Sequence, residues 1–135
     1  MTARLARIIL VMKRPGNVRA TEGVLAPLGA ACVAVGDETA LECALDRGPG
    51  VAVVDASDFG SRAGSLCDIL RSRELPFIVL AAARGAAAGV TEGFFGAAHY
   101  LEKPVGKGLL QQLMYDLMQR AATDAGEERR CTQKS

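Results

Sequence analysis

The sequence predicts an α/β domain in which helices cover both faces of a parallel sheet. Two observations support this fold class: five short apolar runs have the length of buried strands, and segments with helical spacing separate them. Runs that are apolar on both faces are typical of parallel strands covered on both sides. Expected strands cover 8–12, 31–35, 51–54, 76–80 and 98–101. The alternation predicts consecutive β–α units, hence a doubly wound (βα)5 domain.

The helical segments show apolar side chains at a spacing of three or four residues. Asn17 is the expected N-cap of the first helix, which ends before Gly29. The last helix has the most continuous apolar stripe. The glycine-rich segment 86–96 has low intrinsic helicity. Expected helices cover 18–28, 38–47, 61–73, 86–96 and 106–120.

Length and charge limit the classes of function. A chain of 135 residues has the size of one domain, and 16 basic against 15 acidic residues leave a formal charge of +1. This balance gives no sign of nucleic-acid or anionic-membrane binding. The first apolar run has five residues, whereas a signal-peptide core needs roughly 7–15 and a membrane span about 20. We expect a cytoplasmic protein of bacterial type, with one domain over 1–121 and a polar, disordered tail over 122–135.

The cysteines do not form a metal-binding or disulfide pattern. Cys32, Cys43, Cys67 and Cys131 are widely spaced, with no CxxC pair, and His99 is the single histidine. We therefore expect buried structural thiols at the first three positions, and no metal centre.

Two charged residues follow expected strands at the edge where open parallel sheets bind ligands. Asp55 ends a wholly apolar strand, and Lys103 lies two residues beyond another. Because the carboxyl ends of parallel strands meet at one edge, the two side chains are expected to form an ion pair there. Asp58 and Glu102 are interpreted as solvated loop charges.

Together these features resemble the receiver domain of bacterial two-component response regulators. The most specific segment, G-A-A-H-Y-L-E-K-P over 96–104, is similar to the family pattern G-A-x-x-[YF]-[LI]-x-K-P. The strand ends V-V-D over 53–55 and P-F-I-V-L over 76–80 also fit. The resemblance covers residues 7–120 and implies a flavodoxin-like, five-stranded parallel sheet in the order 2-1-3-4-5.

The resemblance also implies roles for individual residues. Asp55 matches the phosphate-accepting aspartate, and Lys103 matches the lysine that pairs with the phosphoryl group. Pro104 matches the proline that usually follows a cis bond, and Tyr100 matches the aromatic residue that reorients on activation. No catalytic residue of an enzyme is expected.

Three functional side chains of the family are missing. The two acids that hold Mg²⁺ are replaced by Met12 and Lys13, or by Lys13 and Arg14 if the alignment shifts by one, and the hydroxyl residue after the fourth strand is Ala81. Because a hard divalent cation prefers carboxylates, we expect weak or absent Mg²⁺ binding and no other cofactor. One hypothesis places the Lys13 ammonium on Asp55 in place of the metal, forming a cluster with Lys103. In the alternative, Lys13 and Arg14 point to water.

The resulting prediction is a stand-alone, atypical receiver in phosphorelay signal transduction. It would act as a phosphorylation-independent protein interaction module rather than an enzyme, with a histidine kinase or a downstream signalling protein as partner and homodimerisation possible. The expected surface comprises the fourth helix, fifth strand and fifth helix: residues 89–95, Tyr100, Glu102 and the outer face of 106–120. The alternative is a receiver still phosphorylated on Asp55 with reduced Mg²⁺ dependence. A flavodoxin-like cofactor-binding enzyme ranks third, since no phosphate-binding loop follows the first strand.

Overall fold

A computed structural model describes residues 7–48, 50–81 and 97–134, with side chains up to residue 121. Five strands form one wholly parallel sheet in the order β2-β1-β3-β4-β5. The strands are β1 (Arg7–Val11), β2 (Cys32–Val35), β3 (Gly50–Asp55), β4 (Phe77–Ala81) and β5 (His99–Glu102). Each lies within a residue or two of an apolar run, so the doubly wound fold predicted from the sequence is confirmed.

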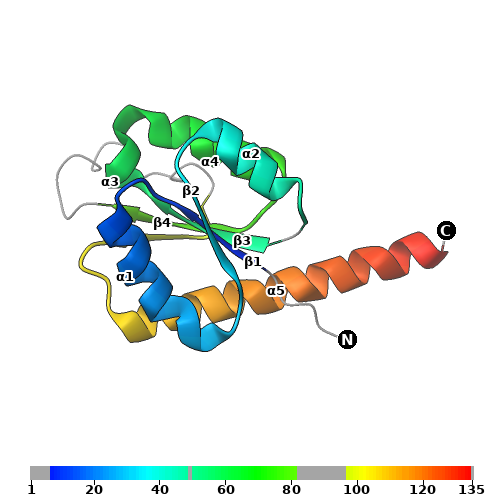
Figure 1. The fold of residues 1–135 in the computed structure, drawn as a ribbon. Coiled ribbons are helices and arrows are strands. Elements are labelled where there is room, and N and C mark those ends of the chain that lie inside the picture. Colours follow the sequence, from blue (N-terminus) through cyan, green and yellow to red (C-terminus); the bar gives the residue numbers. More distant parts are fainter. Residues whose placement is uncertain (1–6, 49, 82–96, 135) are drawn as a thin grey trace.

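Helices cover both faces of the sheet, with α1 (Pro15–Leu25) and α5 (Lys107–Lys134) on one side (Figure 1). The opposite face carries α2 (Glu38–Leu45), α3 (Ala56–Phe59) and α4 (Ala63–Ser72). Successive residues of β1 point to opposite faces of the sheet. Ile8 and Leu10 pack toward α1 and α5, while Ile9 and Val11 pack toward α2 and α4. All four are fully buried. This explains why the strand is apolar at every position.

Helix boundaries differ from the expected ones at the edge that carries the charged residues. The first helix begins at Pro15 with Arg14 as its N-cap, so Asn17 is not the cap and lies inside the first turn. Proline is favoured at this position because its missing N–H would have no partner in the helix. The segment expected as one helix over 61–73 is preceded by α3 and by the short 3-10 helix η2 (Gly60–Arg62). The α3 turn begins immediately after Asp55.

At the other end of the chain, α5 continues to Lys134, beyond the expected end near Arg120. The added segment has no proline and contains three alanines, two glutamates and two arginines, which favour helix without requiring an apolar stripe. The domain boundary at 121 and the disordered tail over 122–135 remain predictions. The expected helix over 86–96 lies outside the described residues. Within the described chain, no helix combines the length and apolar character that a membrane span needs.

Candidate functional site

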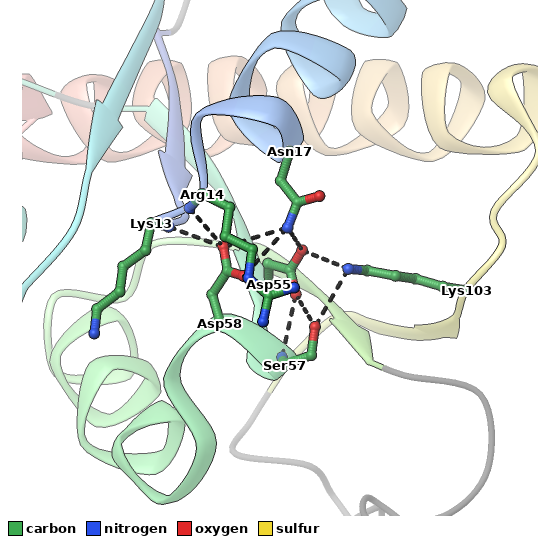
Figure 2. A network of polar contacts seen from close by, with 7 residues as sticks. All are labelled: Lys13, Arg14, Asn17, Asp55, Ser57, Asp58 and Lys103. Carbon is green, nitrogen blue, oxygen red and sulfur yellow. Dashed lines mark hydrogen bonds and ion pairs between the residues drawn. The ribbon is translucent and has the colours of Figure 1, made fainter.

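Polar side chains from three parts of the chain meet at the carboxyl edge of the sheet (Figure 2). Asp55, the last residue of β3, is central to this group and only 1% exposed. It is also the N-cap of α3, where its Oδ1 accepts a hydrogen bond from the backbone N–H of Ser57 at 3.1 Å. The strand therefore carries the carboxylate to the sheet edge, and the following turn holds it in place.

Lys103 reaches the same carboxylate from beyond β5. Its Nζ lies 2.7 Å from Asp55 Oδ2, which confirms the predicted ion pair. The backbone N–H of Lys103 donates to the carbonyl oxygen of Ala81, extending the pairing of β4 and β5 by one residue. The Lys103–Pro104 peptide bond is cis, as the resemblance implied. The lysine is thus presented by the sheet itself, although its side chain remains 33% exposed.

Two further donors complete the shell around Asp55. The Ser57 hydroxyl donates to Oδ1 at 2.6 Å, and the Asn17 side-chain amide donates to Oδ2 at 3.2 Å. Lys103 Nζ also lies 3.3 Å from Ser57 Oγ. Each oxygen of this buried carboxylate therefore accepts two hydrogen bonds from the protein.

Asp58 is a second buried carboxylate, and interpreting it as a solvated loop charge was wrong. Its side chain has 0% exposure. Oδ2 accepts the backbone N–H groups of Lys13 and Arg14 at 2.9 and 3.2 Å, while Oδ1 pairs with Arg14 Nε at 3.3 Å. The Asn17 amide lies within 3.2 Å of Oδ1 and so bridges Asp58 to Asp55. The turn of α3 makes this possible because it places Asp58 beneath the loop that follows β1.

The contacts of Asp58 explain its acidity. Burial raises the pKa of this carboxyl group, but hydrogen bonds from the backbone of Lys13 and Arg14 and from Asn17, together with the Arg14 charge, outweigh burial and hold the pKa below the ordinary value of 3.8. Asp58 is therefore ionised at neutral pH. It forms the anionic anchor of the loop after β1.

The hypothesis that Lys13 pairs with Asp55 is wrong in this structure. The Lys13 side chain points away from the cluster, and its Nζ lies 5.5 Å from the centre of the Phe59 ring. The backbone N–H of Lys13 donates to Asp58, and from this position the Lys13 side chain extends away from Asp55. Arg14 does not simply point to water, because its Nε pairs with Asp58 although the side chain is 69% exposed. Met12 is 2% exposed and belongs to the apolar core.

The remaining predicted residues surround the cluster without joining it. Ala81 ends β4 and is 1% exposed, so no hydroxyl from this position reaches the site. Tyr100 is half-buried on β5 and packs against the core, where burial and the charge of Glu102 raise the pKa of its phenol. Glu102 is exposed, as expected, and His99 is half-buried on the same strand.

Outside the cluster, the thiols described by the structure do not form disulfides. Cys32, Cys43 and Cys67 are free. Cys67 is buried as expected and Cys32 is half-buried, but Cys43 is exposed, so the expectation of a buried thiol is wrong at that position. Burial raises the pKa of Cys67 to about 12, so this thiol stays protonated and inert. Cys131 lies in the part of α5 whose side chains are not described.

The cluster does not match the preferences of Mg²⁺, which favours carboxylate-rich sites with oxygen ligands open to it. Two carboxylates are balanced by two cations, Lys103 and Arg14, and the oxygens of both carboxylates already accept hydrogen bonds from the protein. In the described part of the chain, no three His, Cys, Asp or Glu side chains lie close enough together to hold a metal ion. The site is organised around internal hydrogen-bond donors instead.

This protein matches known proteins in its structure but not in its sequence. No protein-family model and no curated protein matches the sequence. The chain is similar to NtrX from Brucella abortus (TM-score 0.77, 18% identity, 93% of this chain and 29% of that one). It is also similar to a response regulator from Thermotoga maritima (TM-score 0.71, 18% identity, 86% and 99%) and to a response regulator receiver protein from Burkholderia phymatum (TM-score 0.69, 20% identity, 84% and 94%).

These matches agree with the strand order of the sheet. The chain spans less than a third of the NtrX chain but nearly the whole of the Thermotoga and Burkholderia proteins. The protein therefore has the fold of a response regulator receiver domain.

Proposed function

We propose that this chain is an atypical receiver in two-component signal transduction, and that it acts through protein–protein contacts that do not require phosphorylation of Asp55. The observation that carries the proposal is the closed shell around Asp55, which is 1% exposed and accepts two hydrogen bonds at each oxygen. Before phosphorylation, Oδ2 would have to lose a contact with Lys103 or Asn17, or Oδ1 would have to lose a contact with Ser57.

Loss of Mg²⁺ binding is the second part of the proposal. Phosphoryl transfer depends on positioning and on neutralising charge that develops on the phosphoryl oxygens, and a metal ion ordinarily supplies much of that neutralisation. Arg14 already neutralises Asp58, and Lys103 already neutralises Asp55. A divalent cation would therefore add charge to a cluster that is already balanced.

The proposed partner surface includes β5 and the outer face of α5. Leu109 and Tyr115 are large apolar side chains on α5 with 50% and 48% exposure. Glu102 is exposed at the end of β5. Residues 89–95 of this predicted surface lie outside the described residues. A histidine kinase, a downstream signalling protein or a second copy of the chain remains the proposed partner.

The alternative function, a receiver phosphorylated on Asp55 with little need for Mg²⁺, is supported by the position of Lys103. Its ammonium already contacts the acceptor carboxylate and would remain close to a phosphoryl group there. The closed shell argues against it. A cofactor-binding enzyme is a weaker alternative, because the loop after β1 is occupied by its own contacts with Asp58.

Intact mass after incubation with a small acyl phosphate, with and without millimolar Mg²⁺, tests the proposal. Hydroxylamine cleaves an aspartyl phosphate, so the decisive species is a hydroxylamine-labile adduct that Asp55→Asn removes. We expect no such adduct, and no saturable Mg²⁺-dependent shift of the Asn17 side-chain amide in NMR spectra. Asp68→Asn is the matched control, since Asp68 is an exposed carboxylate on α4. A labile adduct that persists in Asp68→Asn and is lost in Asp55→Asn would establish the alternative.

A further inference from the structure

Ser57 is an exposed hydroxyl at the mouth of the pocket, placed between a carboxylate and an ammonium group. We propose that Ser57 Oγ is a phosphoryl acceptor for acyl phosphate donors, with Asp55 as the base and Lys103 as the group that neutralises the transferred phosphoryl. The proposal rests on the proposed function in one respect: Asp55 acts on a neighbouring nucleophile and is not itself the acceptor.

The geometry satisfies the requirements for an activated serine. Ser57 Oγ lies 2.6 Å from Asp55 Oδ1 and donates its proton to it, within the range expected of a nucleophile and its base. Lys103 Nζ lies 3.3 Å from the same Oγ. An ammonium group at that position can contact the oxygens of a phosphoryl group bound to Ser57.

Accessibility distinguishes the two possible acceptors. Asp55 is 1% exposed, and both of its oxygens are engaged by Lys103, Asn17 and Ser57. The Ser57 side chain is on the surface. Its hydroxyl donates its one proton to Asp55 and accepts a hydrogen bond from Lys103 Nζ on one lone pair, which leaves the second lone pair for attack. A donor that approaches from solvent therefore meets Ser57 before Asp55.

The transfer step balances without a metal or a redox partner. Ser57 Oγ attacks phosphorus, the new O–P bond forms, and the bond between phosphorus and the acyl oxygen breaks. The serine proton passes to Asp55 Oδ1, and the donor leaves as a carboxylate. Lys103 then faces a phosphate monoester that competes with Asp55 for its ammonium, so phosphorylation would loosen the Lys103–Asp55 pair.

A second serine in the same protein provides a matched control. Ser65 Oγ donates to Glu38 Oε2 at 2.9 Å and is exposed, but its described contacts include no cation at the hydroxyl oxygen. If a carboxylate partner and exposure were sufficient, Ser65 would react as well as Ser57. Only Ser57 also has Lys103 beside it.

The experiment uses the full chain with acetyl phosphate, intact mass and peptide mapping, before and after hydroxylamine treatment. We expect one hydroxylamine-stable phosphoryl adduct on Ser57, absent in Ser57→Ala and unchanged in Ser65→Ala. Asp55→Asn should slow its formation by about 100-fold, the usual contribution of a general base. Lys103→Met should slow it as well, and circular dichroism would show that each variant is folded.

Several outcomes would overturn the inference, and they differ in what they mean for the proposed function. Absence of any adduct in folded wild-type protein removes the Ser57 proposal and leaves the proposed function intact. Equal reaction at Ser57 and Ser65 also removes it, because Lys103 would then contribute nothing. A hydroxylamine-labile adduct that survives Ser57→Ala and disappears in Asp55→Asn contradicts both proposals.

Discussion

Two groups of ion pairs in this protein have similar chemistry and opposite surroundings. At the carboxyl edge of the sheet, the carboxylates of Asp55 and Asp58 are buried, with side-chain exposures of 2% and 0%. Between α2 and α4, Arg73 pairs with Asp46 and Glu42, whose side chains are 69% and 54% exposed. Both groups join elements that are distant in sequence, but only in the first are the carboxylates removed from water.

The difference shows that burial, more than the number of ion pairs, determines what the protein loses when one partner is removed. An exposed carboxylate that loses its arginine is solvated by water, so the loss is small. A buried carboxylate that loses its donors keeps the full cost of its desolvation. The carboxyl edge should therefore respond strongly to single substitutions, whereas the α2–α4 surface should respond weakly.

The largest effect is expected from Asp58→Ala. This change removes the acceptor for the backbone N–H groups of Lys13 and Arg14 and for the Asn17 amide. We expect a loss of about 2–4 kcal/mol in the free energy of unfolding, because three hydrogen bonds to one charged acceptor and its ion pair with Arg14 are lost together. Urea unfolding measures it, with Asp58→Asn as the isosteric control. A loss below that of Arg73→Ala would show that the loop after β1 does not depend on this carboxylate.

A smaller but clear effect is expected from Lys103→Met. The substitution keeps most of the apolar stem and leaves Asp55 without its ammonium partner, so we expect a loss of about 1–3 kcal/mol, reduced from the fully buried case by the 33% exposure of Lys103. Lys13→Met is the matched control on the same edge. Among the described residues, its ammonium lies 5.5 Å from the centre of the Phe59 ring and forms no ion pair, so the loss should be about 0.5–1 kcal/mol. Equal losses in the two variants would contradict the assignment of Asp55 to Lys103.

The pH dependence of stability separates Asp58 from an ordinary carboxylate. Its folded pKa lies below the ordinary value of 3.8, so its contribution to stability is present above that value and is lost as the pH falls through the lower folded pKa. We expect the stability difference between wild type and Asp58→Asn to be constant above about pH 5 and to narrow below about pH 4. Unfolding in urea at several pH values measures this difference, and a difference that widens on acidification would reverse the assigned direction.

The smallest effect is expected at the exposed surface. Arg73→Ala removes contacts to Asp46 at 3.1 Å and to Glu42 at 3.5 Å, yet the free energy of unfolding should fall by less than about 1 kcal/mol. The loss should also shrink in high salt, since screening weakens exposed pairs. A salt-independent loss comparable with that of Lys103→Met would remove the contrast between the two regions.

The sequence predicted the Asp55–Lys103 ion pair but not the hydrogen bonds of Asp58 and Asn17 beside it. The pairing of Asp55 with Lys103 could be predicted because each residue lies at the end of an apolar run of strand length. Parallel strands bring such ends together at one edge of the sheet. Asp58 and Asn17 were misinterpreted because their spacing suggests a loop charge and a helix cap. One signal in the sequence pointed to Asp58. It lies three residues after Asp55, and a single helical turn brings residues at that spacing to the same side.

The amino-acid sequence by itself determined the parallel α/β fold, the strand order through its resemblance, and the pairing of Asp55 with Lys103. It could do so because burial on both faces requires continuous apolar strands, and strand direction places their ends on one edge. Only the tertiary structure decided where Lys13 points, which donors surround Asp58, and that Asn17 bridges two carboxylates. Those outcomes depend on the path of the backbone after β1 and on the α3 turn, which place residues about 40 positions apart in hydrogen-bond contact and leave no periodic trace in the sequence.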